Sequence, residues 1–281
     1  MKVLITGASG TLGQALCRQL GEKYEVVGLC RPDFDLKDKN GVLVRVKKEN
    51  PDVLIHTAAL TNVDYCQNNP DEAYEVNAKG TANLCEAIKG KNCLFIHIST
   101  DYVFDGTKKG VYIETDKPNP INIYAKTKLE AEKIVSSSTE KNFILRVSWL
   151  FGKKGKDFVS MVVEKIKKNE SLSIICDKFS VPTYAFDLVF AIEVLFKQDQ
   201  YGIYNLANSG SCSWFEWAKK IVEYYGVKSD VQPTQLEDFN FSAVRPKNTV
   251  LNCDKFFNLT GMRLRSWQEA VKEYIEKCYK Q

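Results

Sequence analysis

Three evenly spaced glycines follow the first apolar run of the chain. Residues 2–6 predict a short buried strand, Gly7, Gly10 and Gly13 form a G-x-x-G-x-x-G loop, and apolar residues at helical spacing come next. Strand, glycine loop and helix is the setting of a dinucleotide fingerprint, because a helix N-terminus offers phosphates free N–H groups and a favourable dipole. A purely structural turn is the alternative. The position of the loop in the first strand–helix unit favours the dinucleotide interpretation.

Each glycine of this loop has its own physical reason. Gly7 permits the tight turn, Gly10 lets a pyrophosphate approach the backbone, and Gly13 lets helix and strand pack closely. We expect the cofactor contacts at this end of the site to come from Gly7, Gly10, Thr11, Leu12 and Gly13.

Strands and helices alternate after this first unit. Apolar runs predict further strands at 25–30, 53–55, 94–98 and 143–147, with helical patterns at 39–50, 70–89 and 124–137. This alternation is typical of an α/β fold with a Rossmann-type, doubly wound parallel sheet. It loosens after residue 150. We expect an NAD(P)-binding domain over 1–150, with part of 180–208 returning to it, and a smaller, mainly substrate-binding C-terminal lobe over 151–281.

Composition argues against several classes of function. The net charge of +4 over 281 residues is small and the lysines are spread out, so we expect no nucleic-acid partner. The longest apolar stretch, 185–196, contains two carboxylates and is too short to span a membrane. The two histidines, His56 and His97, lie in apolar runs, where a strand residue with a satisfied ring is more common than a metal ligand.

Cysteine usage bears on the compartment. The nine cysteines have no C-x-x-C pair and no regular spacing, and no signal peptide precedes the first strand. Reduced thiols in a cytoplasmic protein are the simplest interpretation.

A proton-transfer site is predicted where the fourth strand ends. Tyr124 and Lys128 are four residues apart, which places them on one face of a helix about 5–6 Å apart at Cβ. An ammonium beside a phenol depresses the phenol pKa, because the positive charge favours the phenolate. Thr100, after the strand 94–98, would add a hydroxyl that hydrogen-bonds the same carbonyl oxygen.

Cofactor preference is predicted from the residue after the second strand. Arg31 stands where such folds meet the adenosine ribose, and an arginine there pairs with a 2′-phosphate, which favours NADPH. A solvated loop arginine is the alternative. Asp33 and Asp35 leave an acid within reach of a 2′-hydroxyl, so NADH stays open as a second cofactor.

Candidate residues converge at one edge of the predicted sheet. The glycine loop, Ala58–Ala59, Thr100 and Trp149 all follow the carboxyl ends of strands. Ligands of doubly wound sheets bind at that edge. The stretch after the third strand, which is rich in small residues, suits close packing against a cofactor, with plain core packing as the alternative. It consists of Ala58, Ala59, Leu60 and Thr61.

Longer motifs carry a resemblance to a known family. The glycine loop, Ser99–Tyr102 and Tyr124-x-x-x-Lys128 together resemble the extended short-chain dehydrogenase/reductase superfamily. The stretch Ser99–Gly106 (STDYVFDG) resembles, more narrowly, the dTDP-4-dehydrorhamnose reductase family. Further matching stretches are 58–64 (AALTNVD), 146–149 (RVSW), 181–183 (VPT) and 245–248 (RPKN).

The resemblance implies an NADPH-dependent reduction of the 4-keto group of dTDP-4-dehydro-L-rhamnose to dTDP-L-rhamnose. Tyr124 would protonate the carbonyl oxygen, Lys128 would lower the Tyr124 pKa and hold the nicotinamide ribose, and Thr100 would polarise the carbonyl. The family pattern also implies further contacts: to the cofactor from Asp35, Leu36 and Thr61, and to the nucleotide sugar from Thr100, Asp101, Tyr102, Trp149 and Arg245.

Departures from the family pattern and competing functions remain. Some members dimerise through a carboxylate-bound metal just after the third glycine, where this chain has Gln14, so we expect no metal; a homodimer stays open. His56 replaces an Asn common in the third-strand motif.

Two alternatives to the reductase function stay open. One is a related UDP- or GDP-sugar reductase or epimerase, and the other is a non-catalytic NADP-binding subunit resembling the regulatory beta subunit of methionine adenosyltransferase.

Overall fold

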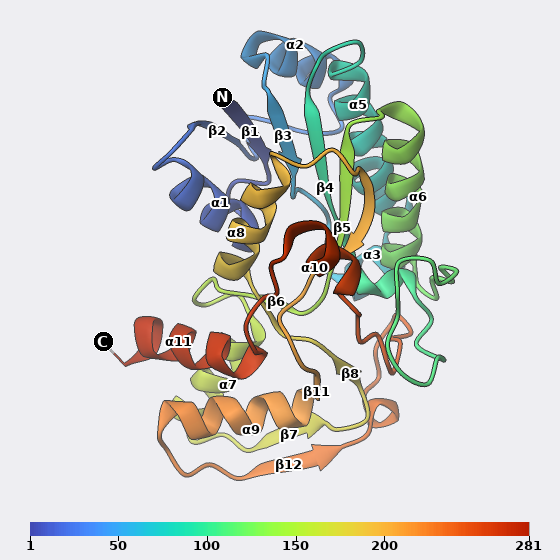
Figure 1. The fold of residues 1–281 in the computed structure, drawn as a ribbon. Coiled ribbons are helices and arrows are strands. Elements are labelled where there is room, and N and C mark those ends of the chain that lie inside the picture. The colour runs from blue at the N-terminus through green and yellow to red at the C-terminus, as the bar shows by residue number, and fades with distance from the viewer. Residues whose placement is uncertain (281) are drawn as a thin grey trace.

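A six-stranded parallel sheet organises the molecule. The computed structural model describes residues 1–280. The strand order is β10-β5-β4-β3-β1-β2 (Figure 1). The strands are β1 (Lys2–Thr6), β2 (Glu25–Leu29), β3 (Val53–His56), β4 (Leu94–Thr100), β5 (Asn142–Val147) and β10 (Gly202–Asn205). The predicted α/β fold with a Rossmann-type parallel sheet is confirmed, and its strand order reverses between β1 and β3.

Helices cover both faces of this sheet, because its strands are apolar on both sides. On one face, α1 (Thr11–Leu20) packs against α8 (Ala185–Leu195), over Val3 and Ile5 of β1. On the other face, α2 (Lys39–Glu49), α5 (Gly80–Ala87) and α6 (Ile123–Ser138) pack over strand residues that include Leu4. Alternate residues of one strand therefore enter different cores, which is the pattern of a buried parallel sheet.

The predicted helix over 70–89 differs in detail. It consists of α4 (Pro70–Tyr74), a π-helical turn η1 (Glu75–Lys79) and α5, joined without a break. Apolar spacing does not reveal such a turn, because it adds one residue to a helix without ending it. A short helix, α3 (Val63–Asn68), precedes this segment and was not predicted.

A smaller lobe follows β5 in the sequence and lies below the sheet in Figure 1. Its core joins α7 (Phe158–Lys167), α9 (Trp214–Tyr225) and α11 (Trp267–Tyr279) to the parallel pair β7 (Leu172–Ile175) and β12 (Val231–Thr234). Capping boxes are present at Ser213–Glu216 and Ser266–Glu269. They fix where α9 and α11 begin.

Short elements connect this lobe to the sheet. The elements not yet described are η2 (Asp101–Val103), β6 (Leu150–Phe151), β8 (Phe179–Ser180), β9 (Thr183–Tyr184), β11 (Cys212–Ser213), η3 (Leu236–Asp238) and α10 (Asp254–Thr260). The chain returns to the sheet through α8 and β10, which pairs with β5. No helix within residues 1–280 is long and apolar enough to cross a membrane.

Candidate active site

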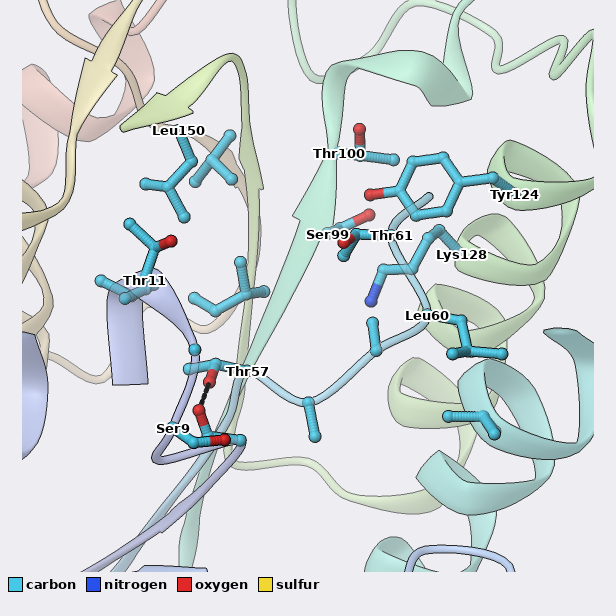
Figure 2. A pocket seen from close by; sticks show the side chains of 18 of the residues that line it. Ser9, Thr11, Thr57, Leu60, Thr61, Ser99, Thr100, Tyr124, Lys128 and Leu150 are labelled. Atoms are coloured by element: carbon cyan, nitrogen blue, oxygen red, sulfur yellow. Dashed lines mark hydrogen bonds between the residues drawn. The ribbon is translucent and has the colours of Figure 1, made fainter. Parts of the chain in front are cut away.

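A cavity of about 790 Å³ runs along the carboxyl ends of the central strands. It is lined by nearly all of the predicted site residues, namely Gly7, Gly10, Thr11, Leu12, Arg31, Asp35, Leu36, Ala58, Ala59, Leu60, Thr61, Thr100, Asp101, Tyr102, Tyr124, Lys128 and Trp149. In Figure 2 the glycine-loop side, with Ser9 and Thr11, faces Tyr124 and Lys128 on α6 across this cavity. The fold therefore brings the proton-transfer cluster and the glycine loop to one site.

The glycine loop is shaped by contacts that exclude side chains. Gly7 has φ of +72°, and a Cβ there would lie 2.7 Å from the backbone nitrogen of Ala58. A Cβ on Gly13 would lie 2.1 Å from the carbonyl oxygen of Gly7. Gly13 does not line the cavity; it lets α1 approach the loop from behind.

This end of the cavity suits a diphosphate. The helix α1 has Gly10 at its N-cap, without a side-chain cap, and its first turn contains no acidic residue. The first-turn N–H groups are thus free to donate, and the dipole favours an anion. Two basic side chains of the loop after β6, Lys153 and Lys156, also line the cavity, and Lys153 Nζ donates to the carbonyl oxygen of Ser9 at 2.5 Å.

The loop after β3 is held by an asparagine of the π-helical turn. Asn77 Oδ1 accepts from the Leu60 N–H at 2.7 Å, and Asn77 Nδ2 donates to the Leu60 carbonyl at 3.0 Å and to Thr127 Oγ1 at 3.0 Å. One buried amide thereby links the Ala58–Thr61 loop to α6.

Tyr124 is held as a neutral phenol. Its side chain lies at the cavity wall, and burial of the hydroxyl raises its pKa above the usual value, because the phenolate is poorly solvated there. A hydrogen bond with Thr100 lowers the pKa of Tyr124, but by less than burial raises it. The net shift is thus upward, and the lowering of this pKa by Lys128 stays a prediction.

Lys128 is buried against the sheet. Burial lowers the pKa of Lys128 to about 8. Its Nζ lies 3.1 Å from Nε2 of His97, which points from β4. Sequence reasoning took His97 for an ordinary strand residue, and no local pattern marks its contact with α6.

Thr100 and Asp101 are coupled to each other. The Thr100 hydroxyl donates to Asp101 Oδ1 at 3.1 Å and accepts from the Tyr102 N–H at 3.2 Å. The other carboxylate oxygen of Asp101 accepts from Ser180 at 3.0 Å and from Thr249 at 2.5 Å. Burial raises the pKa of Asp101. Its oxygens are engaged by protein hydroxyls, so Asp101 ties η2 to the smaller lobe.

Aromatic side chains form the wall next to this cluster. The Tyr102 and Tyr124 rings meet edge to face at 6.1 Å, and Trp149, with a left-handed φ of 38°, stacks on Trp217 at 5.7 Å. Behind them, Lys178 is fully buried; its Nζ lies 4.7 Å from the Tyr102 ring centroid and donates to the Pro246 carbonyl at 2.8 Å. A lysine in a polar stretch gives no signal of such burial.

Arg245 does not line the cavity. Its guanidinium donates to both carboxylate oxygens of Asp64, at 3.0 and 2.5 Å, and lies 3.6 Å from the Phe241 ring centroid. Asp64 also accepts from the Ala243 N–H at 3.0 Å. This ion pair straps the segment 241–246 to α3, beside the cavity.

Carboxylates, thiols and imidazoles of residues 1–280 form no group of three or more that could hold a metal ion. Asp101 and Lys128, at the cavity, are instead bonded to protein partners, as described above.

Known proteins resemble this chain over nearly its whole length. The family described as RmlD substrate binding domain matches residues 1–280. The spore coat polysaccharide biosynthesis protein SpsK of Bacillus subtilis is 35% identical over 277 residues, which cover 98% of this chain and 97% of that protein. The dTDP-4-dehydrorhamnose reductase of Sinorhizobium fredii is 34% identical, covering 98% of this chain and 97% of that protein.

A solved structure extends the likeness to three dimensions. The crystal structure of dTDP-4-dehydrorhamnose reductase from Bacillus anthracis in complex with NADP superposes with a TM-score of 0.95 at 37% identity, covering 98% of this chain and 99% of that one. The resemblance seen in the motifs is confirmed: the chain belongs to the dTDP-4-dehydrorhamnose reductase family.

Proposed function

We propose that the protein reduces the 4-keto group of dTDP-4-dehydro-L-rhamnose with NADPH and forms dTDP-L-rhamnose. The observation that carries the proposal is the convergence of Tyr124, Lys128 and Thr100 in the cavity whose other end is the glycine loop. An aromatic wall of Tyr102 and Trp149 adjoins the same cluster, as a sugar site needs. Family membership supports the choice of substrate.

The residues divide the work of the reaction. Bound NADPH would supply the hydride that reaches the carbonyl carbon. The Tyr124 hydroxyl gives its proton to the carbonyl oxygen, so the ketone becomes an alcohol. The Lys128 ammonium then stabilises the phenolate that remains on Tyr124. Thr100 turns its hydroxyl from Asp101 to the carbonyl oxygen and polarises it.

Residues at the glycine-loop end hold the cofactor in this proposal. The first-turn N–H groups of α1 and the two cavity lysines, Lys153 and Lys156, face the diphosphate. Arg31 and Asp35 line the adenosine end, and Arg31 pairs with the 2′-phosphate of NADPH. The reaction would take place in the cytoplasm, and a homodimer stays a prediction that a solution mass measurement can settle.

A substrate scan tests the proposal. Purified protein is mixed with NADPH and, in separate reactions, with 4-keto sugars linked to dTDP, UDP and GDP, and the loss of NADPH absorbance is followed. We expect oxidation of NADPH with dTDP-4-dehydro-L-rhamnose. Turnover with a UDP- or GDP-sugar alone would assign the protein to a related reductase or epimerase. NADPH binding without turnover of any sugar would favour a regulatory subunit.

A further inference from the structure

The ammonium of Lys128 has a single hydrogen-bond partner among residues 1–280. That partner is Nε2 of His97, at 3.1 Å, and both side chains are buried. The contact joins α6 to the middle of β4, next to the strand end that carries Thr100. Lys128 is thus held from behind, on the side away from the cavity that it lines.

Hydrogen-bond chemistry decides the state of His97. A lysine ammonium has only donors, so Nε2 must accept, and the ring proton then sits on Nδ1. Nδ1 has no hydrogen-bond partner among residues 1–280. Burial also lowers the pKa of His97 well below its usual value, which keeps the ring neutral. A buried N–H without a hydrogen-bond partner costs stability, so a histidine at this position needs an explanation.

The other titratable groups around Lys128 are engaged elsewhere. Glu132, one turn along α6, accepts from Arg146 at 2.7 and 3.0 Å and from Ser99 at 2.5 Å. His56 on β3 is bonded to Thr6 at 2.7 Å and to Thr81 at 3.1 Å. Tyr124 on the same helix points into the cavity (Figure 2). His97 alone therefore directs the ammonium.

We propose that His97 is a positioning residue for Lys128: a neutral acceptor that aims the ammonium at the cavity without neutralising its charge. A carboxylate in this place would bond the ammonium as well, but it would cancel the charge that the phenolate of Tyr124 needs. A neutral imidazole uses one N–H of the ammonium and leaves two for ligand hydroxyls. The proposal rests on the proposed function for the role of Lys128.

Three variants test it. His97→Phe keeps a flat buried ring but removes the acceptor, whereas His97→Gln keeps an acceptor at a similar reach. His56→Phe is the matched control, because His56 lies on the neighbouring strand, is equally buried, and has its ring centroid 5.2 Å from that of His97, yet bonds only threonines.

For His97→Phe we expect kcat/KM to fall about 10-fold to 100-fold, because the Lys128 ammonium is no longer held in one orientation. The alkaline limb of its pH profile should move to lower pH, since losing the acceptor disfavours the ammonium. The Kd for NADPH, measured by fluorescence titration from pH 6 to 9, should rise most at the alkaline end. His97→Gln should recover most of both properties, and His56→Phe should keep the wild-type limb.

Two results would overturn the proposal. One is a His97→Phe protein with the wild-type alkaline limb and the wild-type Kd for NADPH. The other is the same shift in His56→Phe, which would mean that any loss of packing beneath α6 has this effect. If wild-type protein turns over no sugar, the proposed function fails, but the NADPH titrations still decide the role of His97. If His97→Phe does not fold, His97→Gln with a wild-type profile and His97→Leu with a shifted one give the same decision.

Discussion

In the proposed reaction, Tyr124 must hold a proton before the hydride arrives and must tolerate a negative charge afterwards. Burial meets the first demand, because it raises the pKa of Tyr124 and keeps the phenol neutral at the start. Lys128, one turn along α6, meets the second demand, because a nearby cation stabilises the phenolate. In this proposal, burial keeps the Tyr124 phenol neutral before hydride transfer, and Lys128 on the same helical face stabilises the phenolate after it.

Tyr124→Phe tests the acid directly. We expect kcat/KM with the sugar to fall about 10²-fold to 10⁴-fold, because the carbonyl oxygen loses its positioned proton donor. The Kd for NADPH should stay at the wild-type value, since the ring keeps its place. Tyr65→Phe, which removes an exposed phenol bonded to Glu72, is the control and should remain fully active. Wild-type turnover by Tyr124→Phe would assign the proton to another group.

At the level of elements, α1 packs so closely against the glycine loop that Gly13 has no room for a side chain. Gly13→Ala would put a Cβ 2.1 Å from the Gly7 carbonyl oxygen, which is backbone and cannot turn away. We expect destabilisation of about 1–3 kcal/mol in urea unfolding, and a weaker NADPH titration, because the loop must shift. Gln14→Ala, at the next, exposed position of α1, should change neither measurement. A Gly13→Ala protein with unchanged NADPH affinity would contradict the role of this contact.

The ion pair between Arg245 and Asp64, which joins segment 241–246 to α3, leads to a prediction for two variants and their combination. Because Arg245 is bonded to Asp64 through both terminal nitrogens, we expect its effect on the sugar to pass through this pair. Arg245→Lys and Asp64→Asn should each raise the KM for the sugar about tenfold, about 1.4 kcal/mol. The double variant should be no worse than either single variant, and the Kd for NADPH should not move. A rise in KM for Arg245→Lys alone would make Arg245 a direct ligand.

Elements could be predicted where the pattern is local. The strands of the sheet, the glycine loop and the helix that carries Tyr124 and Lys128 all follow from apolar spacing, glycine chemistry and a four-residue interval. The contacts that complete the site join distant segments: Asn77 to Leu60 over 17 residues, Lys128 to His97 over 31 and Arg245 to Asp64 over 181. No window of sequence contains both partners of such a pair. The helix 70–89 was predicted, but its π-helical turn was not, because one added residue does not end the helix or its apolar pattern.

Across the whole molecule, the two buried histidines make stability depend on pH. Burial lowers the pKa of His56 to about 3 and that of His97 well below its usual value, whereas both would titrate near 6.5 in the unfolded chain. The unfolded state therefore binds more protons as pH falls. Stability is full above pH 6.5 and is lost toward pH 3, at about 1.4 kcal/mol per pH unit for each histidine.

The measurement is urea unfolding at pH 7.0 and pH 5.0. We expect the wild-type protein to lose about 2 kcal/mol for each histidine over this interval, in addition to any carboxylate contribution. Because these are the only two histidines of the chain, His56→Gln/His97→Gln should lose this slope. An equal slope in the double variant would place the acid sensitivity in the carboxylates.

The return of the chain to the sheet has a consequence for its synthesis on the ribosome. β10 covers the outer edge of β5, but residues 148–201 must be made between the two strands. At about 5–20 residues per second, the edge of β5 stays open for roughly 3 to 11 s in every nascent chain. An unpaired apolar edge invites pairing with other chains. Chaperone capture at this interval would protect the nascent protein, and a ribosome that stalls after β5 would leave a product prone to aggregation.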